Sequence, residues 1–338
     1  MANIPRKKPT SYDVAKLAGV HRSAVSRAFS DGGSISAKTK EKVMKAAEVL
    51  EYRVNFFARG LQKQNSGLVG IVASRLDTPY RAKQVKLASH ELIRNGYTPI
   101  LLTVDKSDDV SGHMSNLLNY NITGMIVTSD TPPAKIIEEC IQYNVPIVLI
   151  NRDPSITGTD RIQLDIEHAG QMAFDMLRRG GAKKFGVLMP QSQTYTVVGR
   201  AEVFAQKCRD AGLPISIIKT SGQSYTAGIE STQIVYENLA NIDAIFCTTD
   251  LMAFGLLDGL RTRYNIAVPE RLEMLGFDDI EQASWAGYNL STINQDIQES
   301  AVAAVSLMMK RLEQPEKPLE TISILLKPMH RSTTLINV

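Results

Sequence analysis

The chain has 338 residues, of which 43% are hydrophobic and 22% are charged. At roughly 100–200 residues per domain, this length predicts two or three domains, and the composition excludes a disordered chain. No uninterrupted apolar stretch reaches the roughly 18 residues that a membrane helix needs, and no apolar secretory segment follows the basic N-terminus. The three cysteines, Cys140, Cys208 and Cys247, show neither metal nor disulfide spacing, which predicts a cytoplasmic protein in a reducing environment.

The net charge of +3 conceals an uneven distribution along the chain. Residues 1–65 hold thirteen Lys and Arg against five Asp and Glu, whereas the rest of the chain holds 25 against 30. A basic segment of this kind favours contact with a nucleic acid or a membrane surface, and a solvated charged surface is the alternative.

The basic segment predicts two short helices joined by a tight turn. Thr10 followed by Asp13 is typical of a helix start, and Gly19 can adopt the left-handed conformation that ends a helix. Residues 19–21 then form a turn before a second helix at 22–29. Two helices joined by a Gly-containing turn of about three residues form a helix-turn-helix, in which the second helix enters the major groove of DNA.

The second helix presents a polar outer face. Its periodicity turns Val25, Ala28 and Phe29 inward and leaves Arg22, Ser23, Ser26 and Arg27 outward. We predict that Arg22, Ser23 and Arg27 face the major groove. Ser36 can cap a third helix that runs to Leu50.

These residues resemble the N-terminal signature of the LacI/GalR family of bacterial transcription regulators. The resemblance rests on the segments SYDVA at 11–15, AGV at 18–20, VSR at 25–27 and SAKT at 36–39. It continues in EY at 51–52, Asn55, ARGL at 58–61 and RST at 331–333, and so covers nearly the whole chain. It implies that DNA is contacted by Tyr12, His21, Arg22, Ser23, Ser26, Arg27, Ser36, Thr39, Tyr52, Asn55, Ala58, Arg59 and Leu61.

Four positions depart from the family pattern, and one of them is Asn151, which stands where the family often has Asp. His21 stands where Ser or Thr is common, and it is expected to be a weaker N-cap for the second helix. Val54 stands where Pro often precedes the hinge asparagine, so a less rigid hinge is expected without DNA. Val203 replaces the usual Gly, and its bulk is expected to narrow the approach to its helix.

Residues 55–61 resemble the family's hinge helix. This segment is too short to be stable alone, and the resemblance implies a helix that forms when two copies pack together in the minor groove. Leu61 would then wedge into the central base step and kink the duplex. A plain linker in which Leu61 packs on the core is the alternative.

From residue 68 onward, short apolar runs alternate with amphipathic segments. Strands are predicted at 68–73, 97–104, 124–128, 146–150, 184–189, 215–219, 244–248 and 272–277. Helices are predicted at 83–95, 114–120, 134–143, 166–179, 200–211, 227–239 and 251–264. This alternation predicts an α/β fold of two Rossmann-like subdomains, with parallel sheets covered on both faces and ligands at the carboxyl ends of the strands.

The resemblance implies a periplasmic-binding-protein-like core in which the chain crosses between subdomains near Asp165, Ile293 and Lys327. The expected domains are a helix-turn-helix domain at 1–54, a hinge helix and linker at 55–66, and an effector-binding and dimerisation core at 67–338. Within the core, the N-subdomain is expected at 67–164 and 294–326, and the C-subdomain at 165–293 and 327–338.

No motif of the sequence predicts catalysis, a metal site or a cofactor. The five histidines show no HExxH or Cys/His metal spacing, and GxSxG, GxxxxGK[ST] and GxGxxG signatures are absent from the sequence. A solute-binding protein or a sugar-modifying enzyme on the same α/β core is the alternative function. That alternative leaves the basic first 65 residues unexplained.

Polar residues near predicted strand ends are the candidates for an effector site. Asp278 can accept two hydroxyl hydrogen bonds, Arg200 can donate a planar fork, and Tyr80 can supply an aromatic floor. A surface charge for Arg200 and a turn or helix cap for Asp278 are the structural alternatives. With the resemblance added, the expected effector contacts are Tyr80, Thr128, Asn151, Thr196, Arg200, Gln223, Thr249 and Asp278.

The sequence therefore predicts a DNA-binding transcription regulator, expected to be a repressor, whose affinity for its operator is changed by a small molecule. The resemblance implies a near-palindromic double-stranded operator, a sugar or sugar-derived effector, a homodimer with a tetramer as the alternative, and no membrane partner. Either an inducer or a corepressor fits, because coupling between two sites can have either sign.

Overall fold

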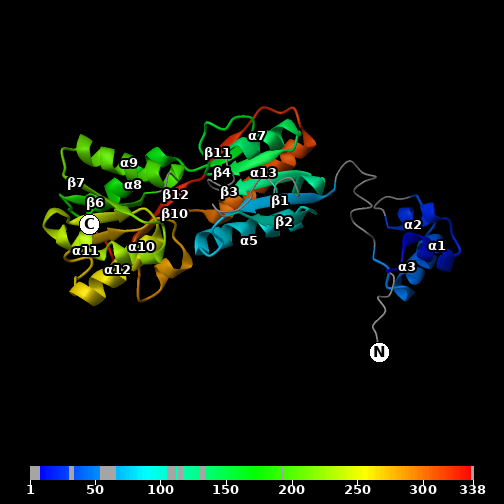
Figure 1. The fold of residues 1–338 in the computed structure, drawn as a ribbon, viewed down its shortest axis with the longest axis horizontal. Helices are drawn as coiled ribbons and strands as arrows, with labels where there is room; N and C mark the ends of the chain where they lie inside the picture. Colours follow the sequence, from blue (N-terminus) through cyan, green and yellow to red (C-terminus); the bar gives the residue numbers. More distant parts are fainter. Residues whose placement is uncertain are drawn as a thin grey trace. The chain divides into compact units, whose positions relative to one another are not determined.

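The computed structural model describes residues 8–29, 34–53, 66–104, 112, 117–128, 134–191 and 194–335. The chain forms two compact units, Met1–Ser66 and Gly67–Val338, both drawn in Figure 1. None of the helices in these ranges is long and apolar enough to cross a membrane.

The first unit contains three helices around a small apolar core. They are α1 (Ser11–Ala18), α2 (Arg22–Ala28) and α3 (Ala37–Val49). Thr10 and Asp13 cap α1 reciprocally, and Gly19 ends it at φ 64°, so both expected signals are confirmed. Ser36 accepts from the Thr39 amide at 3.2 Å and so caps α3. The core is made of residues that the helical periodicity turned inward, chiefly Val14, Val25, Ala28, Val43, Ala46 and Ala47.

The larger sheet of the second unit has six strands in the order β11-β5-β4-β3-β1-β2, and all neighbours are parallel. The strands are β1 (Leu68–Ala73), β2 (Thr98–Thr103), β3 (Gly124–Thr128), β4 (Ile147–Ile150), β5 (Asp160–Gln163) and β11 (Thr321–Ser323). Helices α5 (Pro79–Arg94) and α13 (Ile297–Glu313) pack on the face that includes Val69 and Ile71. Helix α7 (Ala134–Gln142) packs on the opposite face.

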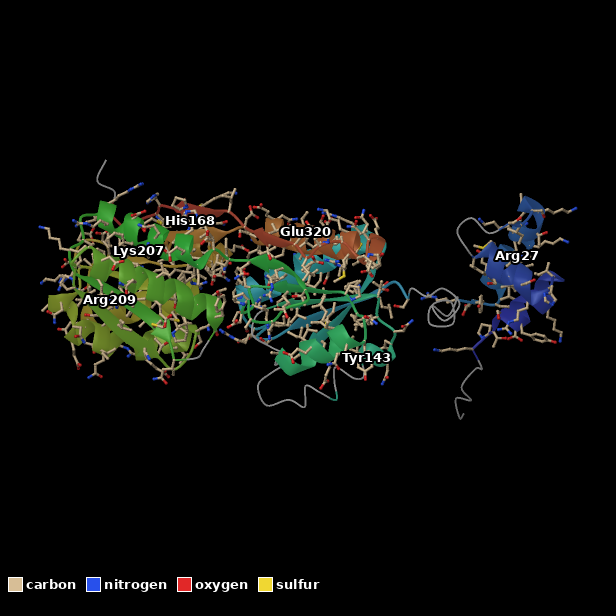
Figure 2. All side chains as sticks on the ribbon, turned by 90° about the horizontal axis from the view of Figure 1, so that it is seen from above. Arg27, Tyr143, His168, Lys207, Arg209 and Glu320 are labelled. Atoms are coloured by element: carbon tan, nitrogen blue, oxygen red, sulfur yellow. The ribbon has the colours of Figure 1, made fainter. Side chains whose placement is uncertain are left out.

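The smaller sheet has four parallel strands in the order β7-β6-β8-β9. They are β6 (Phe185–Pro190), β7 (Ile215–Thr220), β8 (Ala244–Cys247) and β9 (Glu273–Leu275). Helices α8 (Ile166–Arg179) and α9 (Tyr195–Asp210) cover one face. The other face is covered by α11 (Thr232–Glu237), η1 (Leu239–Asn241) and α12 (Asp250–Tyr264), with α10 (Tyr225–Glu230) beside α12. Figure 2 shows His168 and Lys207 on the outer side of α8 and α9.

The chain passes between the two sheets three times. It leaves β5 for α8, and it returns from β10 (Thr292–Gln295) into α13. It crosses again from β11 into β12 (Leu326–Met329), and β10 and β12 form an antiparallel pair between the sheets, visible in Figure 1. A short helix, η2 (Glu281–Ser284), follows the end of β9.

Several element boundaries predicted from the sequence are wrong. Helix α5 begins four residues earlier than expected because Pro79 occupies its first position, where the missing amide costs nothing. Helix α9 begins five residues early, so Arg200 lies within it and not at its start. The helix expected at 227–239 is three short ones, with a break at Ser231, whose hydroxyl donates to the Ala227 carbonyl. Strands β5, β10, β11 and β12 and helix α13 were not predicted as elements, and the strands are short and partly polar.

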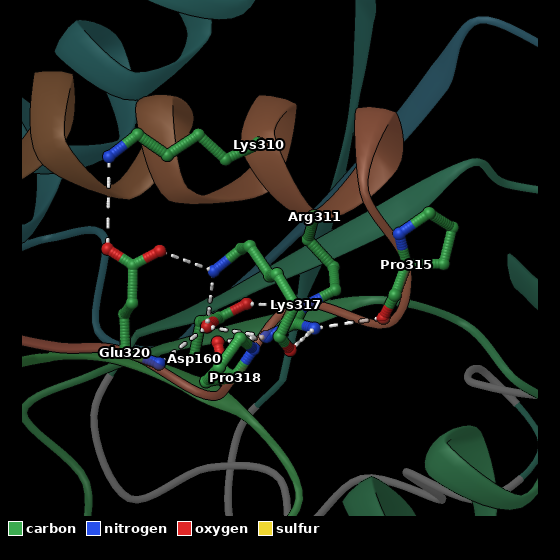
Figure 3. Close-up of polar contacts among 7 residues, drawn as sticks. All are labelled: Asp160, Lys310, Arg311, Pro315, Lys317, Pro318 and Glu320. Carbon is green, nitrogen blue, oxygen red and sulfur yellow. Dashed lines mark hydrogen bonds and ion pairs between the residues drawn. The ribbon is translucent and has the colours of Figure 1, made fainter.

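A buried carboxylate fixes the connection from α13 to the edge strand β11. Asp160 accepts both arms of Arg311, at 2.9 and 3.0 Å, together with Lys317 Nζ at 3.0 Å and the Glu320 amide at 2.9 Å (Figure 3). The remaining donors of Arg311 reach the carbonyls of Pro315, Lys317 and Pro318. Every polar group of this cluster is therefore occupied, which is the condition for burying charge without a large penalty.

Candidate functional site

The first unit presents its second helix as a polar, exposed surface. Arg22, Ser23, Ser26 and Arg27 are all exposed, and Figure 2 shows Arg27 extending from this unit. Arg22 Nε donates to Ser11 Oγ at 3.2 Å, and an Arg27 amino group lies 3.4 Å from Ser23 Oγ. These contacts hold both guanidinium groups on the outer face of α2, where the helical periodicity placed them.

The start of α2 shows how His21 serves as an N-cap. His21 does cap the helix, because its Nδ1 accepts from the Ser23 amide at 3.3 Å and lies 3.0 Å from Ser23 Oγ. The ring nitrogen therefore takes the position that a Ser or Thr hydroxyl would occupy.

The other expected DNA contacts have different environments. Tyr12 is 67% exposed, whereas Tyr52 is half-buried and packs edge-on against Phe29. Ser36 and Thr39 bond to each other at 2.8 Å between their hydroxyls at the start of α3. The expected contacts Asn55, Ala58, Arg59 and Leu61 lie outside the described residues, as does Val54.

The second unit contains a cavity of about 390 Å³ at the carboxyl ends of its strands. Its size falls within the range of small-molecule sites. It is lined by Ser74, Arg75, Asp77, Thr78, Pro79, Tyr80, Arg81, Asn151, Thr194, Thr196, Val197, Arg200, Ser221, Gly222, Gln223, Ser224, Thr249, Leu251, Asp278, Ile280 and Gln295. Parallel strands bring these segments together, because the loops after their carboxyl ends share one edge of each sheet.

Arg200 is the most deeply buried charge of this cavity, with 2% of the residue exposed. It stacks on Phe277 with its guanidinium carbon 3.8 Å from the ring centre, and one amino group donates to the Thr248 carbonyl. The same amino group lies 3.9 Å from Asp278 Oδ1. Its Nε is buried without a hydrogen-bond partner among the described residues. A ligand oxygen in the cavity could satisfy that donor.

Asp278 is held in position by the chain that crosses between the sheets. Its amide donates to the Ile293 carbonyl at 3.0 Å, and its Oδ1 accepts from Gln295 Nε2 at 2.8 Å. Its φ of 120° is rare for a non-glycine residue, and such strain is often found at binding sites. Burial raises the pKa of Asp278, an effect that Arg200 opposes. Burial and Asp278 likewise raise the pKa of Asp250, which accepts from Thr292 Oγ1 behind the cavity.

Amide side chains connect the two sheets around the cavity. Asn151 Oδ1 accepts from the Leu164 amide at 2.8 Å, and its Nδ2 lies 3.5 Å from Gln295 Oε1. Arg75, which follows β1, donates to Gln223 Oε1 at 2.8 Å, and Gln223 in turn donates to Thr194 Oγ1 at 2.9 Å. Residues that follow strands of both sheets therefore meet at this cavity.

Seven of the eight residues expected at the effector site line this cavity, and Thr128 does not. Thr128 is fully buried, and its hydroxyl donates to the Val72 carbonyl within the sheet. Thr249 caps α12, and Tyr80 packs against the apolar cluster of the four-stranded sheet. Burial raises the pKa of Tyr80, so its hydroxyl stays protonated.

Further lining residues were missed in the sequence. The polar ones are Ser74, Arg75, Asp77, Arg81, Thr194, Ser221, Ser224 and Gln295. Ser74 and Arg75 directly follow β1, so the rule of strand ends could have found them. Gln295 ends a strand that was not predicted, so no pattern marked it.

Metal binding has no support in the part of the chain that the structure describes, where no group of three or more His, Cys, Asp or Glu side chains could hold an ion. All three cysteines are free and buried. Burial raises the pKa of Cys140 to about 11 and that of Cys208 to about 12, so both thiols stay protonated at neutral pH.

Two family models match the chain. Residues 10–55 match the family of bacterial regulatory proteins of the lacI type, and residues 174–334 match a periplasmic binding protein-like domain. Catabolite control protein A of Priestia megaterium is 27% identical over 305 residues, which cover 89% of this chain and 92% of that protein. The sucrose operon repressor of Pediococcus pentosaceus is 28% identical over 93% of this chain and 95% of its own length.

A solved structure shares the fold of the chain. The lac repressor dimer bound to its operator and the anti-inducer ONPF matches with a TM-score of 0.85 and 24% identity. The match covers 97% of this chain and 100% of that one. The α/β class and the helix-turn-helix segment predicted from the sequence are thereby confirmed.

Proposed function

The chain belongs to the LacI family of bacterial transcription regulators, and we propose that it is a repressor whose operator affinity is set by a small molecule in the cavity of its second unit. It is a DNA-binding regulator and not an enzyme. One observation carries the proposal: the same chain joins an exposed basic recognition helix to a polar cavity with a buried Arg200–Asp278 pair.

On the DNA side, the proposed contacts are those expected from the sequence, with Arg22, Ser23 and Arg27 of α2 in the major groove. The chain would act as a homodimer on a near-palindromic operator in the cytoplasm, with a tetramer as the alternative assembly. We keep the domain division at 1–54, 55–66 and 67–338 as part of this proposal.

Leu61 would enter the minor groove at the operator centre. An apolar wedge of this kind unstacks a base step and bends the duplex. Leu61→Ala is then expected to reduce bending, measured by fluorescence transfer between duplex ends, and specific affinity, while binding to random DNA survives. Equal bending by both proteins would exclude the wedge.

On the effector side, the ligand would be a sugar or a sugar derivative that contacts residues from both sheets. Asn151, Arg200, Asp278 and Gln295 supply the donors and acceptors that hydroxyl groups need. Because Asn151 follows β4 of the larger sheet and Asp278 follows β9 of the smaller one, a ligand that joins them would change how the two sheets are oriented. A coupling of about 1–3 kcal/mol between the sites is typical of such regulators.

The test combines DNA and ligand titrations of the full chain. Binding to random duplex DNA should be measurable at low salt and weaken steeply as salt rises, because phosphate contacts release counterions. A sugar found by thermal shift should then change operator affinity. The proposal is contradicted if the protein binds no DNA at low salt. It is also contradicted if no ligand of the cavity changes the affinity for the operator.

A further inference from the structure

The cavity carries more positive than negative charge. Arg75, Arg81 and Arg200 line it, against Asp77 and Asp278. Asp278 already lies beside Arg200, and Arg75 donates to the neutral amide of Gln223. The charges of Arg200, Arg81 and Arg75 all lower the pKa of the buried Asp278, against the effect of burial, so the three cations act on the interior of the cavity.

Four α-helices of the described residues begin at this cavity, and two of them lack a side-chain cap. Ser224 caps α10 and Thr249 caps α12. Thr78 and Thr194 occupy the same position in α5 and α9 but make no side-chain bond to the first turn. The Thr78 hydroxyl donates to the Arg75 carbonyl, and the Thr194 hydroxyl accepts from Gln223. Both helices have 16 residues, so their N-termini add positive potential where α5 and α9 meet the cavity.

A buried donor points to the missing acceptor. Arg200 has 2% of its surface exposed, lines the cavity, and its Nε has no hydrogen-bond partner among the described residues. Leaving such a donor unsatisfied is costly, so an occupant with acceptor oxygens is favoured. Nearby, the carboxylate of Asp278 and the amides of Asn151 and Gln295 suit hydroxyl groups.

We propose that the effector is an anionic sugar, whose hydroxyls are bound by Asp278, Asn151 and Gln295 and whose carboxylate or phosphate is bound between Arg75, Arg81 and the N-termini of α5 and α9. This inference rests on the proposed effector function and narrows it to one chemical class. With a neutral sugar, Arg75 keeps its bond to the neutral amide of Gln223, and Arg81 keeps its bond to that of Gln84. An anion would exchange the neutral Gln223 contact of Arg75 for a charge-assisted bond.

The experiment compares matched sets of ligands by calorimetry on the full chain. Each set contains one neutral hexose or pentose, its uronic acid and its terminal phosphate ester, which separates the two sources of negative charge. We expect the tightest ligand to be anionic and to bind about tenfold or more tightly than its neutral counterpart, because hydrogen bonds between charged groups are stronger than those to neutral groups.

The variants Arg75→Gln and Arg81→Gln should remove most of that advantage, because they weaken binding of the anionic ligands far more than binding of the neutral sugar. Arg94→Gln is the matched control, because Arg94 lies in the last turn of the same helix and pairs with Glu91 on the surface. It removes one positive charge and should leave all affinities unchanged.

A neutral sugar that binds as tightly as its charged counterparts, or no anionic ligand that binds at all, would overturn the inference. An anionic advantage that survives both substitutions would overturn the assigned residues. Operator affinity, measured in parallel, separates this inference from the proposed function. If only a neutral sugar shifts operator affinity, the proposed function stands and the inference of an anionic ligand is refuted. If an anionic sugar binds without shifting operator affinity, the inference stands and the proposed function is refuted.

Discussion

The guanidinium of Arg200 lies over the ring of Phe277, with its central carbon 3.8 Å from the ring centre, and Phe277 directly precedes Asp278 in the chain. One aromatic side chain therefore fixes the plane of the guanidinium next to the strained carboxylate residue. Stacking of this kind holds the guanidinium in one orientation, so that its N–H donors point in fixed directions. A lysine at the same position would keep the charge but lose both the stacking and the fork.

We therefore expect Arg200→Lys to abolish ligand binding in the cavity. The loss should be about 2–5 kcal/mol, because a desolvated charge partner is replaced by one with the wrong geometry. Calorimetry with the sugars of the panel measures it, and duplex binding checks that DNA affinity without ligand is retained. Arg209→Lys, near the exposed end of the same helix, is the control. Near-wild-type ligand affinity in Arg200→Lys would return Arg200 to a structural role.

The recognition helix leads to a prediction about base preference. Replacing Arg22 or Ser23 by Ala should change which base is preferred at one operator position, by about 1–3 kcal/mol for each good bidentate hydrogen-bonded pair that the substitution removes. The Arg27 side chain is expected to lie nearest the base edges or a flanking phosphate, so Arg27→Ala should weaken binding to the operator. Binding to a library of operator variants measures this preference. Unchanged preference at every position in both the Arg22 and Ser23 variants would exclude this orientation of α2.

The sequence could predict those parts of the fold that local rules determine. The caps at Thr10 and Ser36 and the buried strands β1, β3 and β4 follow from spacing and apolar runs. Arg200 and Asp278 were expected through the family motif, although α9 begins earlier than its apolar pattern showed. Gln295 could not be found in this way, because its position depends on a four-residue strand that pairs with residues about thirty positions later.

Helices α8 and α9 show how a departure from the family pattern is accommodated. Val203 was expected to narrow the approach to α9, and the structure shows that Gly170 of α8 makes room for it. A Cβ on Gly170 would lie 2.5 Å from Val203 Cγ1 and 2.8 Å from the Phe204 backbone nitrogen. Glycine in a helix interior ordinarily costs about 0.5–1 kcal/mol relative to alanine, so contact between the helices explains its presence.

Gly170→Ala is thus expected to destabilise the chain by about 1–3 kcal/mol, because overpacking outweighs the gain in helix propensity. Val203→Gly in the same chain should recover part of this loss, since it removes the nearest contact. Urea denaturation followed by circular dichroism measures both variants. Gly287→Ala is the control, because no atom lies within 4 Å of its added Cβ. If Gly170→Ala stabilises the chain, α8 and α9 can move apart at little cost, and their close contact does not require glycine at this position.

The last prediction concerns the buried carboxylate of Asp160 and the acid stability of the second unit. Burial tends to raise the pKa of Asp160, but the hydrogen bonds from Arg311, the Glu320 amide and Lys317 outweigh it, and the pKa is lowered. Because the folded pKa lies below the unfolded value of about 3.9, the ionised carboxylate stabilises the fold above that pH. This stabilisation is lost as the pH falls through the folded pKa.

Asp160→Asn should therefore lower the free energy of unfolding at neutral pH by about 3–5 kcal/mol, because it leaves the buried Arg311 without its anion and Lys317 with Glu320 alone. The variant should also lose less stability than the wild type between neutral pH and about pH 3, since it has no carboxylate left to protonate there. Urea titrations at several pH values measure both effects. Glu91→Gln removes a carboxylate from the pair with Arg94, whose side chain is 71% exposed, and should change stability by less than about 1 kcal/mol. If Asp160→Asn and Glu91→Gln behave alike, the cluster of Figure 3 does not hold β11 in place.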